Sequence, residues 1–151
     1  MSLEDDIRSL SRVSLFDGFT DEQLRLLAFG AERLRLQAGK QLFAEGDPAD
    51  SGYVLVAGSV SLGRERDGSR RVLQLLTAPA VLCETALVAE SARPNDAMAE
   101  SACDLIRLNR SQFRRILEEY PALAQRLHDR LAARLASMMD EAAALGARMA
   151  D

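Results

Sequence analysis

The chain has 151 residues, about the size of one domain with its own hydrophobic core. Its composition, 48% hydrophobic and 28% charged, is typical of a globular protein and excludes a mainly disordered chain. The net charge of −4 argues against direct nucleic-acid binding, which usually requires a basic face. The single histidine, His128, excludes a multi-histidine metal centre and opposes a small barrel enzyme of the metal-binding kind. We expect His128 to face the core or an interface.

Neither end of the sequence indicates export or membrane insertion. No apolar run approaches the roughly 20 residues that a membrane span needs. The first ten residues are acidic and lack the basic-then-apolar pattern of an export signal. Cys83 and Cys103 are too few for a disulfide framework, so we expect them to be reduced and half-buried. These features predict a cytoplasmic protein without a membrane-bound part.

Two short helices are predicted within residues 1–32. Leu3, Ile7 and Leu10 recur at helical spacing and indicate a first amphipathic helix. Thr20 and Gln23 form a capping-box pattern, which predicts a second helix from there to about Phe29 or Glu32. The buried face of this second helix is predicted to consist of Leu24, Leu27 and Ala28.

From residue 33 to 108 the hydrophobic period changes from helical to the two-residue period of strands. About eight short strands follow one another, separated by turn signals such as Gly58 and Asp67-Gly68. One helix-like insert, Thr85 to Glu90, interrupts them and would make about one and a half turns. The predicted fold class is mainly β with flanking helices: an eight-stranded jelly-roll barrel, or double-stranded β-helix, within a single domain spanning residues 1–151.

Residues 110–151 return to helical periodicity. A new helix is predicted from about Tyr120, because Pro121 suits a first helical position, and it would extend for about 30 residues. Its apolar residues alternate spacings of four and three, which is a heptad seam. The seam consists of Leu131, Leu135, Met138, Ala142, Leu145 and Met149. The simplest partner for such a stripe is the same helix of a second copy, so we predict a homodimer, and a helix folded back on its own barrel is the alternative.

The stretch 81–97 joins two strands and carries an acid, Glu84, and a base, Arg93, nine positions apart. Loops held by a rigid scaffold are frequent binding sites. The alternative is a surface connection with two solvated charges. Taken alone, this stretch favours the surface connection, and the rest of the chain decides between the two.

The whole order of elements resembles the cyclic-nucleotide-binding domain, in particular the sensor half of bacterial regulators of the catabolite-activator type. The resemblance covers nearly the whole chain, and no single motif is decisive. Its carriers are Leu15–Phe19, Gly39, Glu45–Asp47, Tyr53, Gly58, Leu82–Leu87, Arg93, Ala97–Phe113 and Pro121.

The resemblance implies that 81–97 is a phosphate-binding cassette. Glu84 would accept a hydrogen bond from a ribose hydroxyl, and Arg93 would pair with the cyclic phosphate of cyclic AMP, cyclic GMP or a related small anion. The start of the insert would add free backbone N–H groups. No catalytic activity, metal or resident cofactor is expected. The candidate ligand-binding residues are Leu82, Cys83, Glu84, Thr85, Ala86, Arg93, Pro94 and Asn95.

Two departures from the family pattern bear on the ligand. Cys83 replaces a glycine and would demand a less favourable φ, and Pro94 removes a backbone donor. Two hypotheses therefore stay open: a dimeric sensor that binds a cyclic nucleotide, and a degenerate site on a dimerisation or interaction module. Regulators of this type carry a DNA-binding domain after the last helix, whereas this sequence stops at Asp151. We expect no DNA binding by the chain as given, and the sequence does not indicate an output partner.

Overall fold

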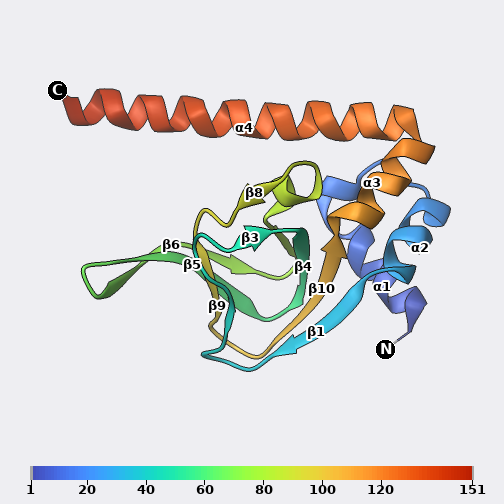
Figure 1. Cartoon of the computed structure of the whole chain (residues 1–151), viewed down its shortest axis with the longest axis horizontal. Helices are drawn as coiled ribbons and strands as arrows, with labels where there is room; N and C mark the ends of the chain where they lie inside the picture. Colours follow the sequence, from blue (N-terminus) through green and yellow to red (C-terminus); the bar gives the residue numbers. More distant parts are fainter. Residues whose placement is uncertain (1, 151) are drawn as a thin grey trace. The chain divides into compact units, whose positions relative to one another are not determined.

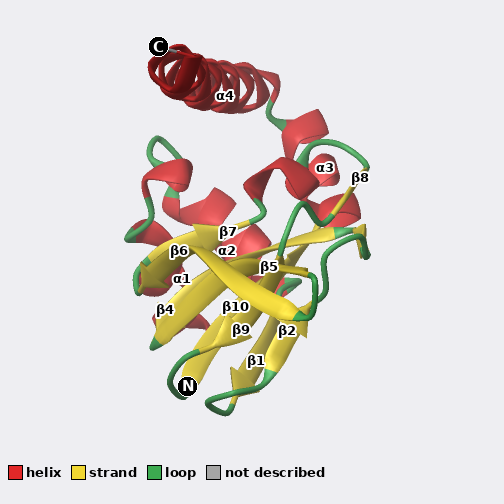
Figure 2. Cartoon of the chain, turned by 90° about the vertical axis from the view of Figure 1, so that its left-hand side faces the viewer, coloured by secondary structure: helices red, strands yellow, loops and turns green. Residues whose placement is uncertain are grey.

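The computed structural model describes residues 2–150, apart from the side chains of residues 134, 135, 137–139 and 141–150. It divides into two units, Met1–Ile116 and Leu117–Asp151, which are described separately. The first unit holds all the strands, which form its body (Figures 1 and 2).

The first N-terminal helix lies where the spacing of its apolar residues predicted, and the second begins at its predicted capping box. Helix α1 spans Leu3–Ser11, the 3-10 helix η1 spans Ser14–Phe16, and α2 spans Asp21–Phe29. At the start of α2, the Thr20 hydroxyl accepts from the Gln23 backbone N–H at 3.2 Å, and the Gln23 side chain accepts from the Thr20 N–H at 2.8 Å. Two otherwise unpaired helix donors are thereby satisfied. The predicted inner face of Leu24, Leu27 and Ala28 is buried.

Antiparallel strands form two four-stranded sheets and one small ribbon. The strands are β1 (Glu32–Leu36), β2 (Gln41–Phe43), β3 (Pro48–Ala49), β4 (Ser51–Ala57), β5 (Ser59–Arg66), β6 (Ser69–Thr77), β7 (Ala80–Leu82), β8 (Ser91–Ala92), β9 (Asp96–Ala99) and β10 (Cys103–Asn109). One sheet has the order β1-β10-β4-β7, the other β2-β9-β5-β6, and β3 pairs with β8. The described chain thus has ten strands where eight were predicted. The two extra strands have two residues each, too few for a visible alternation.

The core of the first unit consists of side chains from both four-stranded sheets. Val60, Leu55 and Leu105 are at most 1% exposed, and the rings of Phe43 and Tyr53 stack with centroids 6.0 Å apart. Leu82 and Cys103 belong to the same cluster, whereas Cys83 packs against it from the edge. The predicted alternation is visible in β1, where Leu34 and Leu36 are half-buried between exposed residues, whereas β4 is buried throughout Ser51–Leu55 and β6 is mostly exposed.

The turns between strands follow their predicted residues. Asp67 and Gly68 both have positive φ, 56° and 80°, which suits the two-residue turn between β5 and β6. The resulting hairpin extends beyond the other strands (Figure 1). Gly58 has a φ of 94°, and a Cβ there would lie 2.3 Å from the Ala102 carbonyl oxygen. Gly58 is therefore required both by its backbone angle and by close packing.

Helix α3 spans Arg110–Glu119 and buries Phe113 and Ile116. The second unit consists mainly of α4, Pro121–Ala150, which begins at the proline as predicted. The side chains of Leu135, Met138, Ala142, Leu145 and Met149 lie outside the described residues, so the heptad seam stays a prediction. The side chain of His128 is 79% exposed, so the predicted core position is wrong and an interface position stays a prediction. Within the described residues, no helix combines the length and apolar character that a membrane crossing requires.

Candidate functional site

The cassette begins with β7, which pairs with β4 so that Leu82 lies opposite Tyr53. Leu82 is buried, and Cys83 then turns the chain into a single 3-10 turn, η2, spanning Glu84–Leu87. This corrects the predicted helical insert at 85–90. The turn starts one residue earlier and ends at Leu87, and the Val88 and Ala89 N–H groups that follow it donate to the Thr85 carbonyl at 3.2 and 3.1 Å.

Cys83 adopts a left-handed backbone conformation, with φ 57° and ψ 46°. The expectation of an unfavourable φ at this position is thus confirmed, because a side chain here costs about 1–2 kcal/mol relative to glycine. The cassette keeps the backbone path that a glycine would permit, and the thiol is added to it. Burial raises the pKa of the Cys83 thiol, and the adjacent Arg93 guanidinium opposes this effect only in part. The thiol is therefore neutral at pH 7.

Gly52 lets the cassette lie close to β4. A Cβ at this position would lie 3.0 Å from Leu87 Cγ and 3.3 Å from the Cys83 carbonyl oxygen. Both contacts are tighter than a packed interior tolerates without displacement. The sequence analysis missed Gly52, and the only available signal was a glycine at the start of a strand-like run.

Arg93 is anchored by its backbone and buried through its side chain, which is 3% exposed. Its N–H donates to the Asp47 carbonyl at 2.8 Å, and its carbonyl accepts from the Gly46 N–H at 2.9 Å. These bonds continue the β3–β8 ribbon beyond its paired residues. The guanidinium carbon lies 4.6 Å from the centre of the Phe43 ring and 5.4 Å from that of Tyr53. The arginine found by counting nine positions from Glu84 therefore has a buried side chain.

The Arg93 guanidinium retains unused donor capacity. Nη1 donates to the Ser51 carbonyl at 2.8 Å and Nη2 to the Ser51 hydroxyl at 3.3 Å. Nε has no hydrogen-bond partner among the described residues. Asp50, at 4.0 Å, is a weak counter-charge because its side chain is 59% exposed to water. A buried cation with a free donor is suited to an incoming anion.

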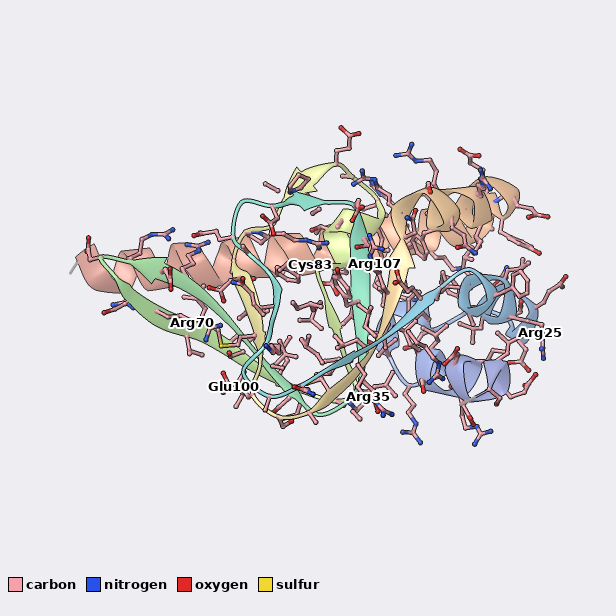
Figure 3. All side chains as sticks on the ribbon, turned by 60° about the horizontal axis from the view of Figure 1, so that its bottom comes forward. Arg25, Arg35, Arg70, Cys83, Glu100 and Arg107 are labelled. Atoms are coloured by element: carbon pink, nitrogen blue, oxygen red, sulfur yellow. The ribbon has the colours of Figure 1, made fainter. Side chains whose placement is uncertain are left out.

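Ser51 connects Arg93 to a second arginine. The Ser51 hydroxyl also accepts from Arg107 Nε at 3.1 Å, and Arg107 in turn pairs with Glu32 at 3.1 Å and with Asp50 at 3.2 Å. Burial would raise the pKa of Asp50, but hydrogen bonds from Ser51 and Arg107 outweigh it and the pKa is lowered. Arg107, one member of this chain of contacts, is labelled in Figure 3. The sequence analysis did not identify Ser51, Asp50 or Arg107 as partners, since all three lie outside the cassette.

The remaining predicted site residues differ in their exposure. Ala86 is buried, Glu84 and Asn95 are half-buried, and Thr85 and Pro94 are exposed. The negative charge of Glu84 adds to the effect of burial in raising the pKa of the Cys83 thiol. The Asn95 side-chain oxygen is buried without a partner among the described residues.

Arg110, at the start of α3, holds the cassette turn from outside. Its Nη1 donates to the carbonyls of Ala49 at 2.8 Å, Ala89 at 3.0 Å and Ala86 at 3.4 Å. One side chain thus donates to carbonyl groups from β3, from the turn and from the segment after the turn. The sequence analysis did not identify Arg110, because a single arginine after a strand carries no local signal of this role.

The site thus consists of a buried arginine behind a short turn, carried by two four-stranded antiparallel sheets and a two-stranded ribbon. The sequence profile of the cyclic nucleotide-binding domain matches residues 33–120, more than half of the chain. The chain belongs to the cyclic nucleotide-binding domain family, as the resemblance predicted.

Three similar proteins illustrate this membership. The cyclic AMP receptor protein of Thermus thermophilus is 30% identical over 122 residues, covering 80% of this chain and 56% of that protein. The solved structure of a cyclic nucleotide-binding-like protein from Brucella abortus is 51% identical, with a TM-score of 0.69, covering 76% of this chain and 98% of that one. The N-terminal domain of a transcriptional regulator from Streptomyces coelicolor is 29% identical, with a TM-score of 0.77, covering 87% and 93%. The chain spans little more than half the length of the curated relatives it matches first, 56–57%.

Proposed function

We propose that the chain is a regulatory sensor domain whose cassette binds a cyclic nucleotide, cyclic AMP or cyclic GMP. The observation that carries this proposal is the buried Arg93 guanidinium, whose Nε has no partner among the described residues. A cyclic phosphate carries one negative charge, and a guanidinium can meet it with two donors. In this role Glu84 accepts from the ribose hydroxyl, since a carboxylate can only accept.

The other cassette residues support the fit of a ligand in different ways. Cys83 preserves the left-handed backbone that brings Glu84 to the start of the turn, and its thiol narrows the space beside Arg93. The buried side chains of Leu82 and Ala86 hold the cassette against the interior of the first unit. Pro94 offers no N–H to a phosphate, so Arg93 carries more of the anion's binding energy than it would beside an additional backbone donor. The affinity for a cyclic nucleotide is therefore expected to depend strongly on this one side chain.

A thermal-shift titration tests the proposal. Cyclic AMP or cyclic GMP should raise the melting temperature progressively, by the equivalent of about 2.7 kcal/mol at a ligand concentration 100 times Kd. Arg93→Ala should abolish this rise, whereas Arg71→Ala, which removes an exposed positive charge from β6, should preserve it. 5′-AMP serves as the non-cyclic control. No shift with either cyclic nucleotide at millimolar concentration, in a protein that melts cooperatively, would contradict the proposal.

We further propose that the sensor is a homodimer in the cytoplasm, paired through the seam of α4, and that it acts on an output domain or partner protein. The support is the four-and-three spacing of Leu131, Leu135, Met138, Ala142 and Leu145. Light scattering should give twice the chain mass. Leu135→Glu should give the monomer mass, and Ala136→Glu, one position off the seam, should leave the dimer intact. A dimer that survives Leu135→Glu would rule the seam out.

A second candidate is an interaction module that has lost its nucleotide. It is favoured by the Ser51 contacts, which already occupy two Arg93 nitrogens, and by the thiol at position 83. This candidate predicts the same dimer mass and no response to any cyclic nucleotide. The thermal-shift titration therefore separates the two.

A further inference from the structure

Three arginines of the β5–β6 hairpin reach toward the segments that flank Arg93. Arg64 Nε donates to the Pro94 carbonyl at 3.1 Å. Arg66 binds the Glu45 carboxylate through both terminal nitrogens, at 2.8 and 3.0 Å. Arg70 binds the Asp96 carboxylate through Nε at 3.0 Å and Nη2 at 2.7 Å. These bonds connect the β5–β6 hairpin to segments on both sides of Arg93.

Arg70 reaches Asp96 by crossing the middle strand of the sheet. β6 pairs with β5, β5 pairs with β9, and Gly63 of β5 lies directly opposite Asp96. A Cβ on Gly63 would lie 2.9 Å from Arg70 Nε and Cζ. The absence of a side chain at Gly63 thus gives Arg70 its path across the strand. Along this path Nη1 and Nη2 also donate to the Ser61 hydroxyl at 3.0 Å and the Ser61 carbonyl at 3.1 Å.

The Arg70–Asp96 contact is more buried than the Arg66–Glu45 contact. The Arg70 and Asp96 side chains are 18% and 7% exposed, whereas Arg66 and Glu45 are 61% and 32% exposed. Exposed ion pairs contribute little, and breaking a buried, hydrogen-bonded pair leaves an uncompensated charge. The Ser61 hydroxyl also donates to Glu100, which lies with Arg70 at the same end of the molecule (Figure 3). Arg70 therefore makes four hydrogen bonds, two to Ser61 of β5 and two to Asp96 in the strand that follows Arg93.

We infer that Arg70 and Asp96, with Gly63 as the gap between them, position Arg93 for the ligand anion. Asp96 is three residues after Arg93 and is the first residue of β9. Only Pro94 and Asn95 separate the two, and Pro94 has a fixed φ, so the position of Asp96 constrains the direction in which Arg93 leaves the ribbon. The pair does not touch the ligand site itself. It acts through the backbone of residues 93–96.

The inference deepens the proposed function and rests on it for the identity of the anion. It is tested first without ligand, through the Arg93 Nε–H signal in a two-dimensional proton–nitrogen NMR spectrum, assigned by its loss in Arg93→Lys. Arg70→Gln and Asp96→Asn should each shift this signal. Arg71→Gln, which removes the same charge from the neighbouring residue of β6, should leave it unchanged. A pair that only supported stability would lower the melting temperature without moving this signal.

The same variants are then titrated with cyclic AMP by calorimetry. Arg70→Gln and Asp96→Asn should each raise Kd on the order of tenfold, the effect of one weakened charge-assisted hydrogen bond to the phosphate. The double variant should be no weaker than either single variant, because both act through one contact. Arg71→Gln should bind like the wild type.

The inference and the proposed function are contradicted by different results. An unchanged Arg93 signal and an unchanged Kd in folded Asp96→Asn would overturn the inference. Asp96→Asn keeps the shape of the carboxylate, so it carries the test if Arg70→Gln does not fold. Failure of the wild type to bind any cyclic nucleotide would overturn the proposed function, and the NMR comparison would still decide whether the pair positions Arg93.

Discussion

Arg93 lies on Ser51, donating to its carbonyl at 2.8 Å and to its hydroxyl at 3.3 Å. Because Ser51 is fully buried and its hydroxyl also accepts from Arg107, one oxygen holds two guanidinium groups in place. This arrangement explains how a cation can be buried behind the cassette when the carboxylate paired with it among the described residues, that of Asp50, is exposed. Neutral acceptors and two aromatic rings do most of the compensation.

Ser51→Ala should therefore destabilise the protein. The substitution leaves Arg93 and Arg107 each without one acceptor, and an unsatisfied buried donor costs about 1–3 kcal/mol. Urea unfolding should show a loss in this range. Ser69→Ala, at an exposed position of β6, is the control and should stay within about 0.5 kcal/mol of the wild type. Equal effects of the two substitutions would show that the Ser51 hydroxyl contributes no more to the free energy of unfolding than an exposed hydroxyl does.

The left-handed backbone of Cys83 predicts an inverted order of stability between two small replacements. Cys83→Gly should be more stable than Cys83→Ala by about 1 kcal/mol, because only the Ala variant keeps a Cβ at φ 57°. At ordinary backbone angles the glycine variant would be the less stable of the two. Thermal unfolding of both variants checks the order. Cys83→Val should be less stable than either, since a branched side chain is hardest to place there.

The raised pKa of Cys83 predicts slow alkylation near neutral pH. The rate follows the thiolate fraction, so its midpoint with pH should lie above that of a free cysteine. Peptide mass spectrometry after iodoacetamide treatment separates Cys83 from the buried Cys103. Arg93→Gln should displace the midpoint further upward, since the guanidinium lowers this pKa. A midpoint at or below that of free cysteine would contradict the burial described for the thiol.

The same shift has a consequence for stability. Because the pKa is raised in the folded state, the thiol's contribution to stability is complete below its ordinary value of 9.0. The contribution is then lost as the pH rises through the folded-state pKa. Cys83→Ala should flatten the decline of stability above pH 9.

Arg110 predicts a local effect on the cassette turn. Arg110→Gln removes a group that donates to three carbonyls, two of them in and after η2. Amide hydrogen exchange over residues 86–90 should accelerate about tenfold or more, equivalent to a local loss of about 1.4 kcal/mol. Arg114→Gln, an exposed position four residues along α3, is the matched control. Exchange that changes equally in both variants would show that the effect arises from α3 and not from the carbonyl contacts.

Features that depend on neighbouring residues were predictable from the sequence, and features that depend on distant contacts were not. Helix starts at Thr20 and Pro121 and the Asp67-Gly68 turn were predictable because their signals depend on residues adjacent in the chain. The strand region was predictable because alternation is a local period, whereas the two-residue strands β3 and β8 were not. The insert was misplaced because its length is not visible in the local pattern, and Leu87 at its end lies against Gly52, 35 positions earlier in the sequence.

By itself the sequence determined the order of elements, the position of Arg93 relative to Glu84 and the presence of a non-glycine residue at position 83. Only the tertiary structure decided that Cys83 takes a left-handed backbone, that Arg93 is buried on Ser51, and that Arg70 crosses Gly63 to reach Asp96. The partners in the last two contacts are 42 and 26 positions apart along the chain. Such contacts depend on strand register and burial, which place backbone groups within a few ångströms irrespective of their separation in sequence.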